Sequence, residues 1–331
     1  MKEILGKLIE CQRLTFEESR SLMHGIAKNQ LNESQIAAIL TALIIRTVTI
    51  EELRGFRQAL LDLAVRVKLN DGYGIDLCGT GGDGKNTFNI STVSAFVVAA
   101  AGYPVIKHGN YGATSVSGSS NTMEYLGYTF SSDEAKLQME LDKTGICFLH
   151  APLFHPALKS VGPVRRQLGI KTFFNLLGPL VNPAAPQYQL SGVYSPEAGR
   201  IYSYLLQEEN KKFAVIHSLD GYDELSLTSP LKLFTHNEET LIDFAEKGLR
   251  RIDPLSIEGG KTIKESAGIF ISILENRSTT EQLTVTQANA ALAISCIDET
   301  KSFEESFTQA GETIRSGKAF SLFKELIDMQ K

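Results

Sequence analysis

The sequence predicts an α/β protein in which a small all-helical domain precedes a larger α/β domain with a mainly parallel sheet. Three observations lead to this prediction. The first 66 residues carry repeated signatures of helix starts, a turn-rich stretch follows at Lys68–Gly74, and from Ile75 short apolar runs alternate with helical stretches. An alternation of strands and helices is typical of βαβ units with a parallel sheet.

Capping boxes predict the first helices, because a polar residue followed three positions later by Glu or Gln satisfies the open N–H groups of a helix start. The pairs are Thr15 with Glu18, Asn32 with Gln35, and Thr49 with Glu52. Apolar residues recur at helical spacing after each pair, as at Leu22 and Ile26. We therefore expect a helical domain over residues 1–70.

Short apolar runs bounded by Gly, Pro or polar residues predict the strands of the larger domain, residues 71–331. The runs are "GIDLCG", "YPVIKHG", "GICFLHA", "QLSGVY" and "KFAVIHS". Helical stretches lie between them: "TVSAFVVAAAG", "DEAKLQMELDKTG" and "PEAGRIYSYLLQEEN". The tail from Phe303 is predicted to be helical again.

The strand–helix alternation pauses at His155–Pro183, where Leu158, Val161, Val164 and Leu168 have the spacing of one helix. We expect this segment, at about residues 160–185, to rejoin the helical domain.

Composition excludes several classes of protein. The net charge is −5, with 33 basic and 38 acidic residues, so no overall basic field favours nucleic acid. The four cysteines form no CxxC pair, which indicates reduced thiols. The N-terminus lacks an apolar stretch of signal length, and the longest apolar runs are too short to span a bilayer. We expect a cytoplasmic protein that binds neither membrane nor nucleic acid.

The glycine-rich loop Gly79–Gly84 follows a predicted strand and precedes a helix that should begin near Ser91. Glycines let backbone N–H groups approach an anion, and a helix N-terminus adds further donors. Asn89, Ser91 and Thr92 place short polar side chains there. Ordinary N-capping is the alternative interpretation of these side chains.

The glycines also satisfy the GxGxxG pattern of dinucleotide sites through Gly79, Gly81 and Gly84. That pattern requires a helix that opens inside the glycines and an acidic residue at the end of the next strand. Here "KNTFN" intervenes, and the next strand ends in Lys107 and His108. The sequence favours a phosphate ligand over a dinucleotide.

Lys107 is expected at the C-terminal end of its strand, where open parallel sheets bind ligands. A second loop with Gly112, Gly118 and five hydroxyl residues between Thr114 and Ser120 follows. Two such loops would suit a ligand with two separate phosphate groups, although plain turns remain the alternative.

Charged pairs elsewhere supply candidate ligands. Asp223 and Glu224 follow a predicted strand, and such carboxylates could hold Mg²⁺ beside a phosphate. Arg165 and Arg166 lie in a predicted helix, where one guanidinium could bind a carboxylate. Solvated surface positions are the alternative for both pairs.

His108 and His155 are the histidines closest to these motifs. Neither lies in a Ser, Cys, His and Asp arrangement that indicates a covalent mechanism. We expect structural hydrogen bonds for both, and no residue acting as acid, base or nucleophile.

These stretches together resemble the anthranilate phosphoribosyltransferases. The motifs are "GTGGDGKNTFNIST" (Gly79–Thr92), "KHGN" (Lys107–Asn110), "SGSSN" (Ser117–Asn121), "HPALKSVGPVRRQLGIKTFFNLLGPLVNP" (His155–Pro183) and "GYDELS" (Gly221–Ser226). They follow one another over nearly the whole chain. The resemblance implies a small helical domain hinged to a larger α/β domain, usually in a homodimer.

The resemblance also implies a reaction, in which phosphoribosyl pyrophosphate donates its phosphoribosyl group to anthranilate in tryptophan biosynthesis. It implies Mg²⁺ held by Ser91, Asp223 and Glu224, and anthranilate bound by Gly79, Asn110 and Arg165. The implied donor-binding residues are Gly79, Gly82, Asp83, Thr87, Asn89, Ile90, Ser91, Thr92, Lys107, His108, Gly109, Asn110, Ser115 and Ser119.

The chain departs from the family pattern at two places in the second loop. Tyr111 stands where the family usually has arginine, and Ser120-Asn121 stands where it usually has Ala-Asp. Phe154 replaces a common histidine. Two rival functions remain: a pyrimidine nucleoside phosphorylase, which resembles longer chains, and a non-catalytic nucleic-acid-binding relative, which should be basic.

Overall fold

The structure is a computed structural model that describes residues 2–112, 117–209 and 211–331. The chain divides into two compact units: Met1–Val67 with Ala151–Pro183, and Lys68–His150 with Ala184–Lys331. The first unit is helical and the second is α/β with a mostly parallel sheet, which confirms the predicted fold class.

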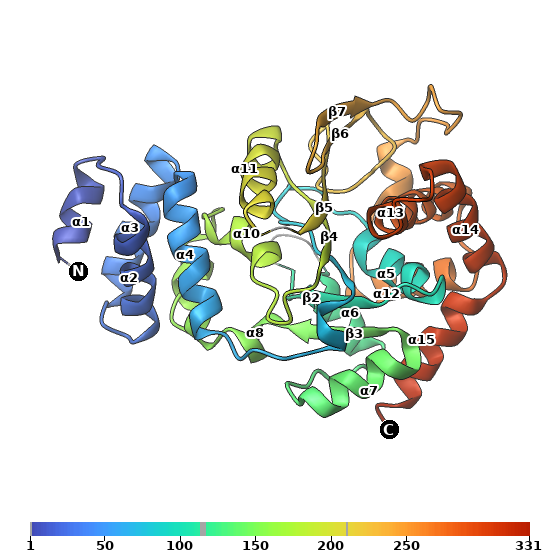
Figure 1. Cartoon of the computed structure of the whole chain (residues 1–331), viewed down its shortest axis with the longest axis horizontal. Helices are drawn as coiled ribbons and strands as arrows, with labels where there is room; N and C mark the ends of the chain where they lie inside the picture. Colours follow the sequence, from blue (N-terminus) through green and yellow to red (C-terminus); the bar gives the residue numbers. More distant parts are fainter. Residues whose placement is uncertain (1, 113–116, 210) are drawn as a thin grey trace. The chain divides into compact units, whose positions relative to one another are not determined.

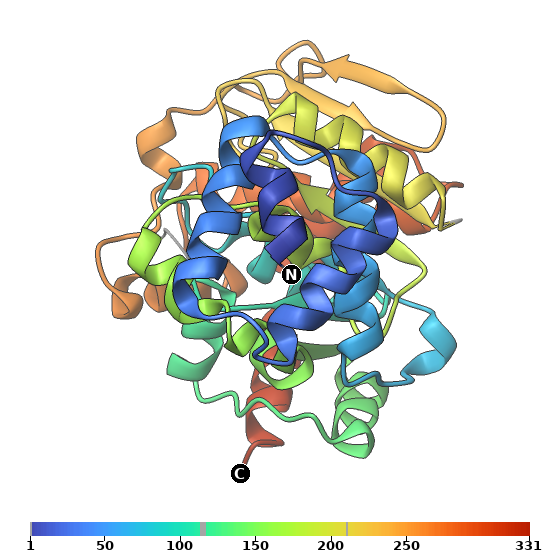
Figure 2. The same cartoon turned by 90° about the vertical axis from the view of Figure 1, so that its left-hand side faces the viewer.

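The first unit is built from helices (Figure 2). Its elements are α1 (Lys2–Ile9), α2 (Phe16–Ala27), α3 (Glu33–Arg46), α4 (Ile50–Leu63), α8 (Ala151–Phe154), the 3₁₀ helix η2 (Pro156–Lys159), α9 (Gly162–Leu168), α10 (Phe174–Leu177) and the 3₁₀ helix η3 (Gly178–Leu180). All three predicted capping boxes are present, at Thr15, Asn32 and Thr49. Apolar faces of α2 and α4 pack together, and α1 packs against α3.

One predicted helix of this unit is divided in two. The spacing of Leu158 to Leu168 predicts a single helix, but η2 ends at Lys159 and α9 begins at Gly162. Pro163 explains the break, because proline lacks an N–H and clashes with the preceding turn unless it lies in the first turn of a helix.

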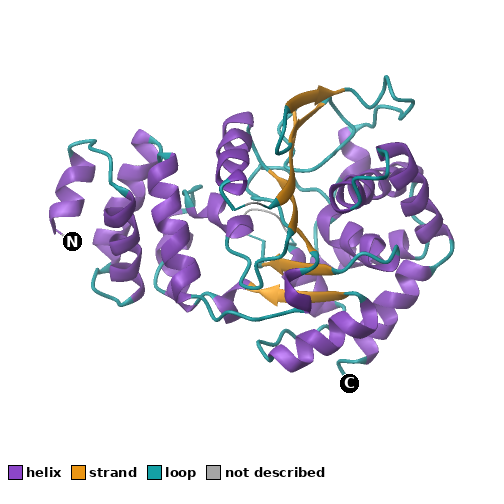
Figure 3. Cartoon of the chain, viewed as in Figure 1, coloured by secondary structure: helices purple, strands orange, loops and turns teal. Residues whose placement is uncertain are grey.

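The second unit contains one seven-stranded sheet, shown in orange in Figure 3. Its strands are β1 (Ile75–Leu77), β2 (Val105–Gly109), β3 (Ile146–His150), β4 (Tyr188–Gly192), β5 (Lys212–Ser218), β6 (Leu231–Phe234) and β7 (Glu239–Ile242). The order is β3-β2-β1-β4-β5-β6-β7, and the first five strands in this order are parallel. All five predicted strands are confirmed, whereas the antiparallel strands β6 and β7 were not predicted.

Helices of the second unit pack on the sheet and on one another. They are α5 (Ile90–Ala100), α6 (Ser119–Tyr125), α7 (Glu134–Thr144), α11 (Pro196–Gln207), α12 (Ile263–Leu274), α13 (Thr280–Ile297), α14 (Phe303–Arg315) and α15 (Lys318–Asp328), with the 3₁₀ helices η1 (Asn70–Gly72) and η4 (Pro254–Ile257). The buried helices α5 and α13 pack on one face, and α11 lies on the other side of β5 (Figure 1). Within the described residues no helix is both long and apolar enough to cross a membrane.

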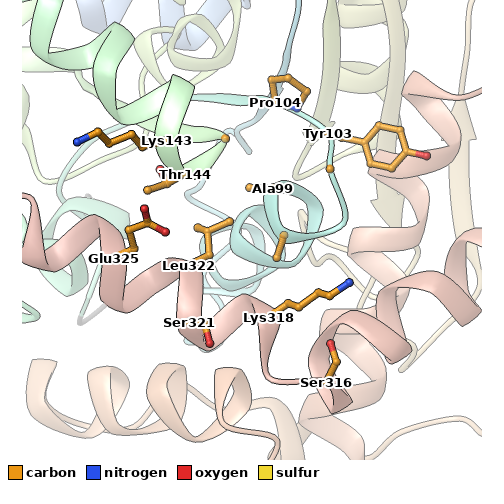
Figure 4. Close-up of a pocket in the computed structure, with 13 residues that line it drawn as sticks. Ala99, Tyr103, Pro104, Lys143, Thr144, Ser316, Lys318, Ser321, Leu322 and Glu325 are labelled. Carbon is orange, nitrogen blue, oxygen red and sulfur yellow. The ribbon is translucent and has the colours of Figure 1, made fainter.

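A hollow of about 460 Å³ lies at the edge where β2 and β3 begin (Figure 4). The ends of α5 and α7 and the start of α15 line it, and its charged side chains Lys143, Lys318 and Glu325 are exposed. None of the predicted site residues lines this hollow.

A close approach of α2 and α4 generates the first prediction. A Cβ on Gly55 would overlap the Phe16 carbonyl and lie 2.7 Å from Ser19 Cβ. We expect Gly55→Ala to destabilise the protein by about 1–3 kcal/mol, the usual cost of overpacking. Denaturant unfolding followed by circular dichroism measures the change.

Gly6→Ala is the matched control, because Gly6 lies inside α1 with no atom within 4 Å of an added Cβ. Alanine favours helix over glycine by up to about 1 kcal/mol, so this variant should be neutral or more stable. Equal behaviour of the two variants would contradict the packing argument.

Candidate functional site

The glycine loop after β1 is held against the acidic turn that follows β5. Gly81 N–H donates to Asp223 Oδ2 at 2.7 Å, and Thr80 N–H donates to the Gly192 carbonyl at 2.9 Å. A Cβ on Gly79 would lie only 2.8 Å from Asp223 Oδ2, and Gly81 has a positive φ of 62°. A side chain at Gly79 would therefore prevent the acidic turn from packing against this loop.

The start of α5 closes the loop. Asn89 is the N-cap residue, but its side chain makes no capping bond. Its Nδ2 instead donates to Thr122 Oγ1 at 2.7 Å and to Ser266 Oγ at 2.9 Å. The N-capping interpretation is therefore wrong for Asn89, because its side-chain oxygen accepts no N–H of α5 and its Nδ2 is directed to tertiary partners.

Two buried hydroxyls near this loop lack a partner. Thr80 Oγ1 and Thr92 Oγ1 make no hydrogen bond to any described residue, and Thr92 is 1% exposed. A buried hydroxyl without a partner costs free energy, so such atoms indicate a place where a ligand supplies the missing bond.

Lys107 is the middle residue of β2 rather than its C-terminal end, which corrects the expectation. The strand continues to Gly109 because it pairs with β3 as far as His150. The Lys107 ammonium is buried and donates to the Leu77 carbonyl and, at 3.3 Å, to Ser91 Oγ.

The acidic turn holds two carboxyl groups with raised pKa values. Burial, followed by the Asp83 carboxylate, raises the pKa of Asp223 to about 7. Burial, followed by the Asp223 carboxylate, raises the pKa of Glu224 to about 8, although Lys107 and the Ser91 N–H oppose this shift. Each of these neighbouring negative charges opposes ionisation of the others, and a bound cation would relieve this repulsion.

These carboxyl groups suit a magnesium ion. No group of three or more His, Cys, Asp or Glu side chains in the described residues is arranged to hold a metal. Mg²⁺ requires fewer, because it usually takes one or two carboxylates and completes its shell with water and substrate phosphate oxygens. The Ser91 N–H lowers the pKa of Glu224, which indicates that Ser91 lies near this carboxyl group.

The second loop begins where β2 ends. Ser119 Oγ donates to the Asn110 carbonyl at 3.3 Å, so two predicted ligand-binding residues are in contact. His108 N–H donates to the buried Asp76. Ser115 lies outside the described residues. Thr87 lies apart from this loop, in a β-bridge with Glu258.

Arg165 lies on α9 in the helical unit and is half-buried. Its Nη2 donates to Asn175 Oδ1 at 3.3 Å, and its guanidinium lies 5.4 Å from the centre of the Phe174 ring. Burial lowers the pKa of Arg165, and no acidic side chain among the described residues pairs with it. A partly desolvated guanidinium without a carboxylate is suited to an anionic ligand.

Two polar residues beside Arg165 were missed in the sequence. Asn175 Oδ1 also accepts the Thr172 N–H at 3.1 Å, and the buried Thr172 hydroxyl has no partner among the described residues. A single asparagine inside the apolar run "FFNLLGPL" is the signal that could have identified this position, because buried polar residues are rarely without a role.

His155 has the structural role expected for it. Its Nε2 is 2.8 Å from the Val181 carbonyl, and burial lowers its pKa to about 4. The ring is therefore neutral at pH 7 and unsuited to acid–base work.

Two family profiles match the chain. The helical bundle domain of a glycosyl transferase family matches residues 2–64, and the a/b domain of the same family matches residues 72–320. The chain is 51% identical to the anthranilate phosphoribosyltransferase of Flavobacterium johnsoniae over 329 residues, with 99% of each chain covered. It is 50% identical to that of Christiangramia forsetii, with 98% of each covered.

Solved structures of anthranilate phosphoribosyltransferases are also similar to this chain. The anthranilate phosphoribosyltransferase of Thermus thermophilus has a TM-score of 0.91 at 30% identity and 99% coverage of both chains. The enzyme of Saccharomyces cerevisiae, solved with PRPP and Mg, has a TM-score of 0.90 at 25% identity, covering 99% of this chain and 97% of that one.

The acidic turn generates a prediction about pH. The pKa values of Asp223 and Glu224 are higher in the folded chain than the ordinary 3.8 and 4.5. Between the ordinary and the raised pKa values, the folded chain holds protons that the unfolded chain has released. The contribution of the two carboxyl groups to stability therefore falls as pH rises and is lost above about pH 8. We expect Asp223→Asn with Glu224→Gln to remove this decline, measured by melting temperature from pH 5 to 9 without divalent cations.

The double variant should therefore gain stability relative to the parent chain as pH rises. A constant difference between the two proteins over this range would contradict the raised pKa values.

Proposed function

The chain belongs to the anthranilate phosphoribosyltransferases of the glycosyl transferase family, and on this premise we propose how its own residues carry out the family's reaction. The enzyme transfers the phosphoribosyl group from phosphoribosyl pyrophosphate to the amine of anthranilate, a step of tryptophan biosynthesis. The observation that carries our assignment of residues is the glycine loop bound through Gly81 to the recessed acidic turn at Asp223.

The donor binds on the glycine loop and the second loop. Backbone N–H groups of the glycine loop approach the pyrophosphate, and the buried Thr80 and Thr92 hydroxyls gain the partners that the protein does not supply. Thr80 is an addition to the residues expected from the resemblance. Those remain proposed donor ligands: Gly79, Gly82, Asp83, Thr87, Asn89, Ile90, Ser91, Thr92, Lys107, His108, Gly109, Asn110 and Ser119, with Ser115 outside the described residues.

Asn89 and Lys107 support the donor site in different ways. Asn89 uses its side-chain amide to fix the start of α5. The buried Lys107 ammonium contacts the Ser91 hydroxyl, so it supplies positive charge beneath the loop.

Magnesium is held by Asp223, Glu224 and Ser91. When bound, it neutralises charge on the departing pyrophosphate. The two carboxyl groups must lose their protons to bind the ion, and because their pKa values are raised, they release those protons when a cation arrives.

Anthranilate binds through its carboxylate to Arg165, with Asn110 and Gly79 as further ligands. The planar guanidinium donates two parallel N–H bonds to a carboxylate, and Asn175 holds that guanidinium in place. The aromatic amine of anthranilate is neutral at pH 7, so it needs no strong base before attack.

The chemistry consists of positioning and charge stabilisation. The C1–pyrophosphate bond breaks through an oxocarbenium-like state, as in glycoside cleavage, while the amine nitrogen forms the new bond to C1 and loses one proton to the departing pyrophosphate or to water. N–H donors and Lys107 stabilise the leaving group.

Loss of anthranilate fluorescence with purified chain, Mg²⁺ and phosphoribosyl pyrophosphate tests the function, and no loss of signal would refute it.

A homodimer belongs to the same proposal, since it rests on the family resemblance. Analytical ultracentrifugation of the purified chain at micromolar concentration checks it.

The carboxyl pair generates a prediction about protons. At pH 7 we expect Mg²⁺ binding in the presence of phosphoribosyl pyrophosphate to release protons from Asp223 and Glu224. Calorimetry in two buffers of different ionisation enthalpy measures the number released. Asp223→Asn with Glu224→Gln should abolish the release and cripple turnover in a folded protein. Unchanged proton release in this variant would exclude the acidic turn as the metal site.

Arg165 generates a prediction about the acceptor. Arg165→Ala should raise the KM for anthranilate by an amount equivalent to about 1.5–3 kcal/mol, the value of a hydrogen bond to a charged group. The KM for the donor should change much less. Arg165→Lys should rescue only in part, because lysine lacks the fork geometry.

The exposed Arg166 is the matched control, because it neighbours Arg165 on the same helix. Arg166→Ala should leave both KM values near those of the parent chain. A normal KM for anthranilate in Arg165→Ala would remove Arg165 from the acceptor site.

A further inference from the structure

Three consecutive residues at the start of the second loop are each bonded to α6. The Asn110 carbonyl accepts the Ser120 N–H at 3.2 Å. Tyr111 Oη donates to Glu124 Oε1 at 2.8 Å, and Gly112 N–H donates to Asn121 Oδ1 at 3.0 Å. The helix thus fixes the direction in which the chain leaves β2.

Two of these residues make further contacts. The Tyr111 ring also packs edge-on against His150 with 4.7 Å between the ring centres. Asn121 Oδ1 accepts a second N–H, from Gly118, at 3.0 Å. The side-chain oxygen of Asn121 therefore accepts N–H groups from both ends of the second loop.

The partner of Tyr111 on β3 is itself fixed. His150 is buried, lies 2.9 Å from Ser120 Oγ through its Nδ1, and stacks on Phe130 with 4.6 Å between ring centres. Tyr111 therefore packs against a rigid surface, although 43% of it is exposed.

The same helix is joined to the first loop. Thr122 Oγ1 accepts from Asn89, the residue that precedes α5, and lies 2.8 Å from Ser117 Oγ. A displacement of α6 would therefore move both the Asn110 segment and the end of the glycine loop.

We propose that Tyr111, Asn121 and Glu124 form a hydrogen-bonded latch that positions Asn110 for its two substrates. This inference rests on the proposed function, which makes Asn110 a ligand of both donor and acceptor. Tyr111 is a positioning residue, since its hydroxyl is occupied by Glu124.

The first test removes only the latch hydroxyl. Tyr111→Phe keeps the ring against His150 and loses the bond to Glu124. We expect the KM values for phosphoribosyl pyrophosphate and anthranilate to rise about three- to tenfold, the effect of losing one such hydrogen bond, with kcat changed less than about twofold. Tyr125→Phe is the matched control, because Tyr125 is an exposed tyrosine on α6 with no hydrogen bond to a described residue, and it should change neither constant.

Rescue separates positioning from general stability. Glu124→Gln retains an oxygen acceptor for Tyr111 and should behave like the parent chain, whereas Glu124→Ala should match Tyr111→Phe. The double variant Tyr111→Phe with Glu124→Ala should be no worse than either single variant, as expected for two residues that share one bond. Additive losses would overturn the latch.

Amide hydrogen exchange of the free protein tests the latch without substrate. Peptides covering residues 108–112 should exchange faster in Tyr111→Phe than in Tyr125→Phe. Equal exchange and equal KM values in these two variants would overturn the proposal. An inactive parent chain would instead refute the proposed function, and the exchange result would still decide whether the latch exists.

Discussion

The contact between the glycine loop and the acidic turn is the constraint on which the site depends. Gly81 and Asp223 are 142 positions apart in sequence, yet one hydrogen bond joins them. The turn fits there only because neighbouring positions lack a Cβ: a side chain at Gly79 would contact the Asp223 carboxylate, and one at Gly192 would overlap its carbonyl. Loops after β1 and β4 and the turn after β5 thus converge because adjacent parallel strands end at one edge.

Hydrogen bonds connect this contact to the rest of the candidate site. Asn89 links the start of α5 to α6 and α12, through Thr122 and Ser266. The helix α6 in turn holds the chain that leaves β2. The two predicted phosphate loops are therefore parts of one network, and the polar residues between them act through their mutual contacts as well as through a ligand.

The sequence was sufficient to predict the helices and strands that are determined by residues close together in the chain. Capping boxes located α2 to α4, and alternation of apolar runs located the five parallel strands, because both patterns are set within a few residues. Long-range contacts decided the rest. N-capping was one interpretation of Asn89, but its amide bonds to tertiary partners instead. Lys107 was expected at a strand end, but pairing with β3 extends β2 beyond it. The short strands β6 and β7 were missed, since β7 is mostly exposed and shows no apolar run.

Charge explains why the acidic turn can serve an anionic donor. Asp83, Asp223 and Glu224 would repel a pyrophosphate if all three were ionised, and the structure avoids this state by raising two of their pKa values. Protonation of Asp223 and Glu224 and binding of a divalent cation are thus alternative ways to neutralise the negative charge of the acidic turn. Lys107 reaches the same region but is occupied by the Leu77 carbonyl and Ser91, so it only partly offsets the negative charge. The residues of the chain therefore leave a deficit of positive charge that a metal ion arriving with the donor would fill.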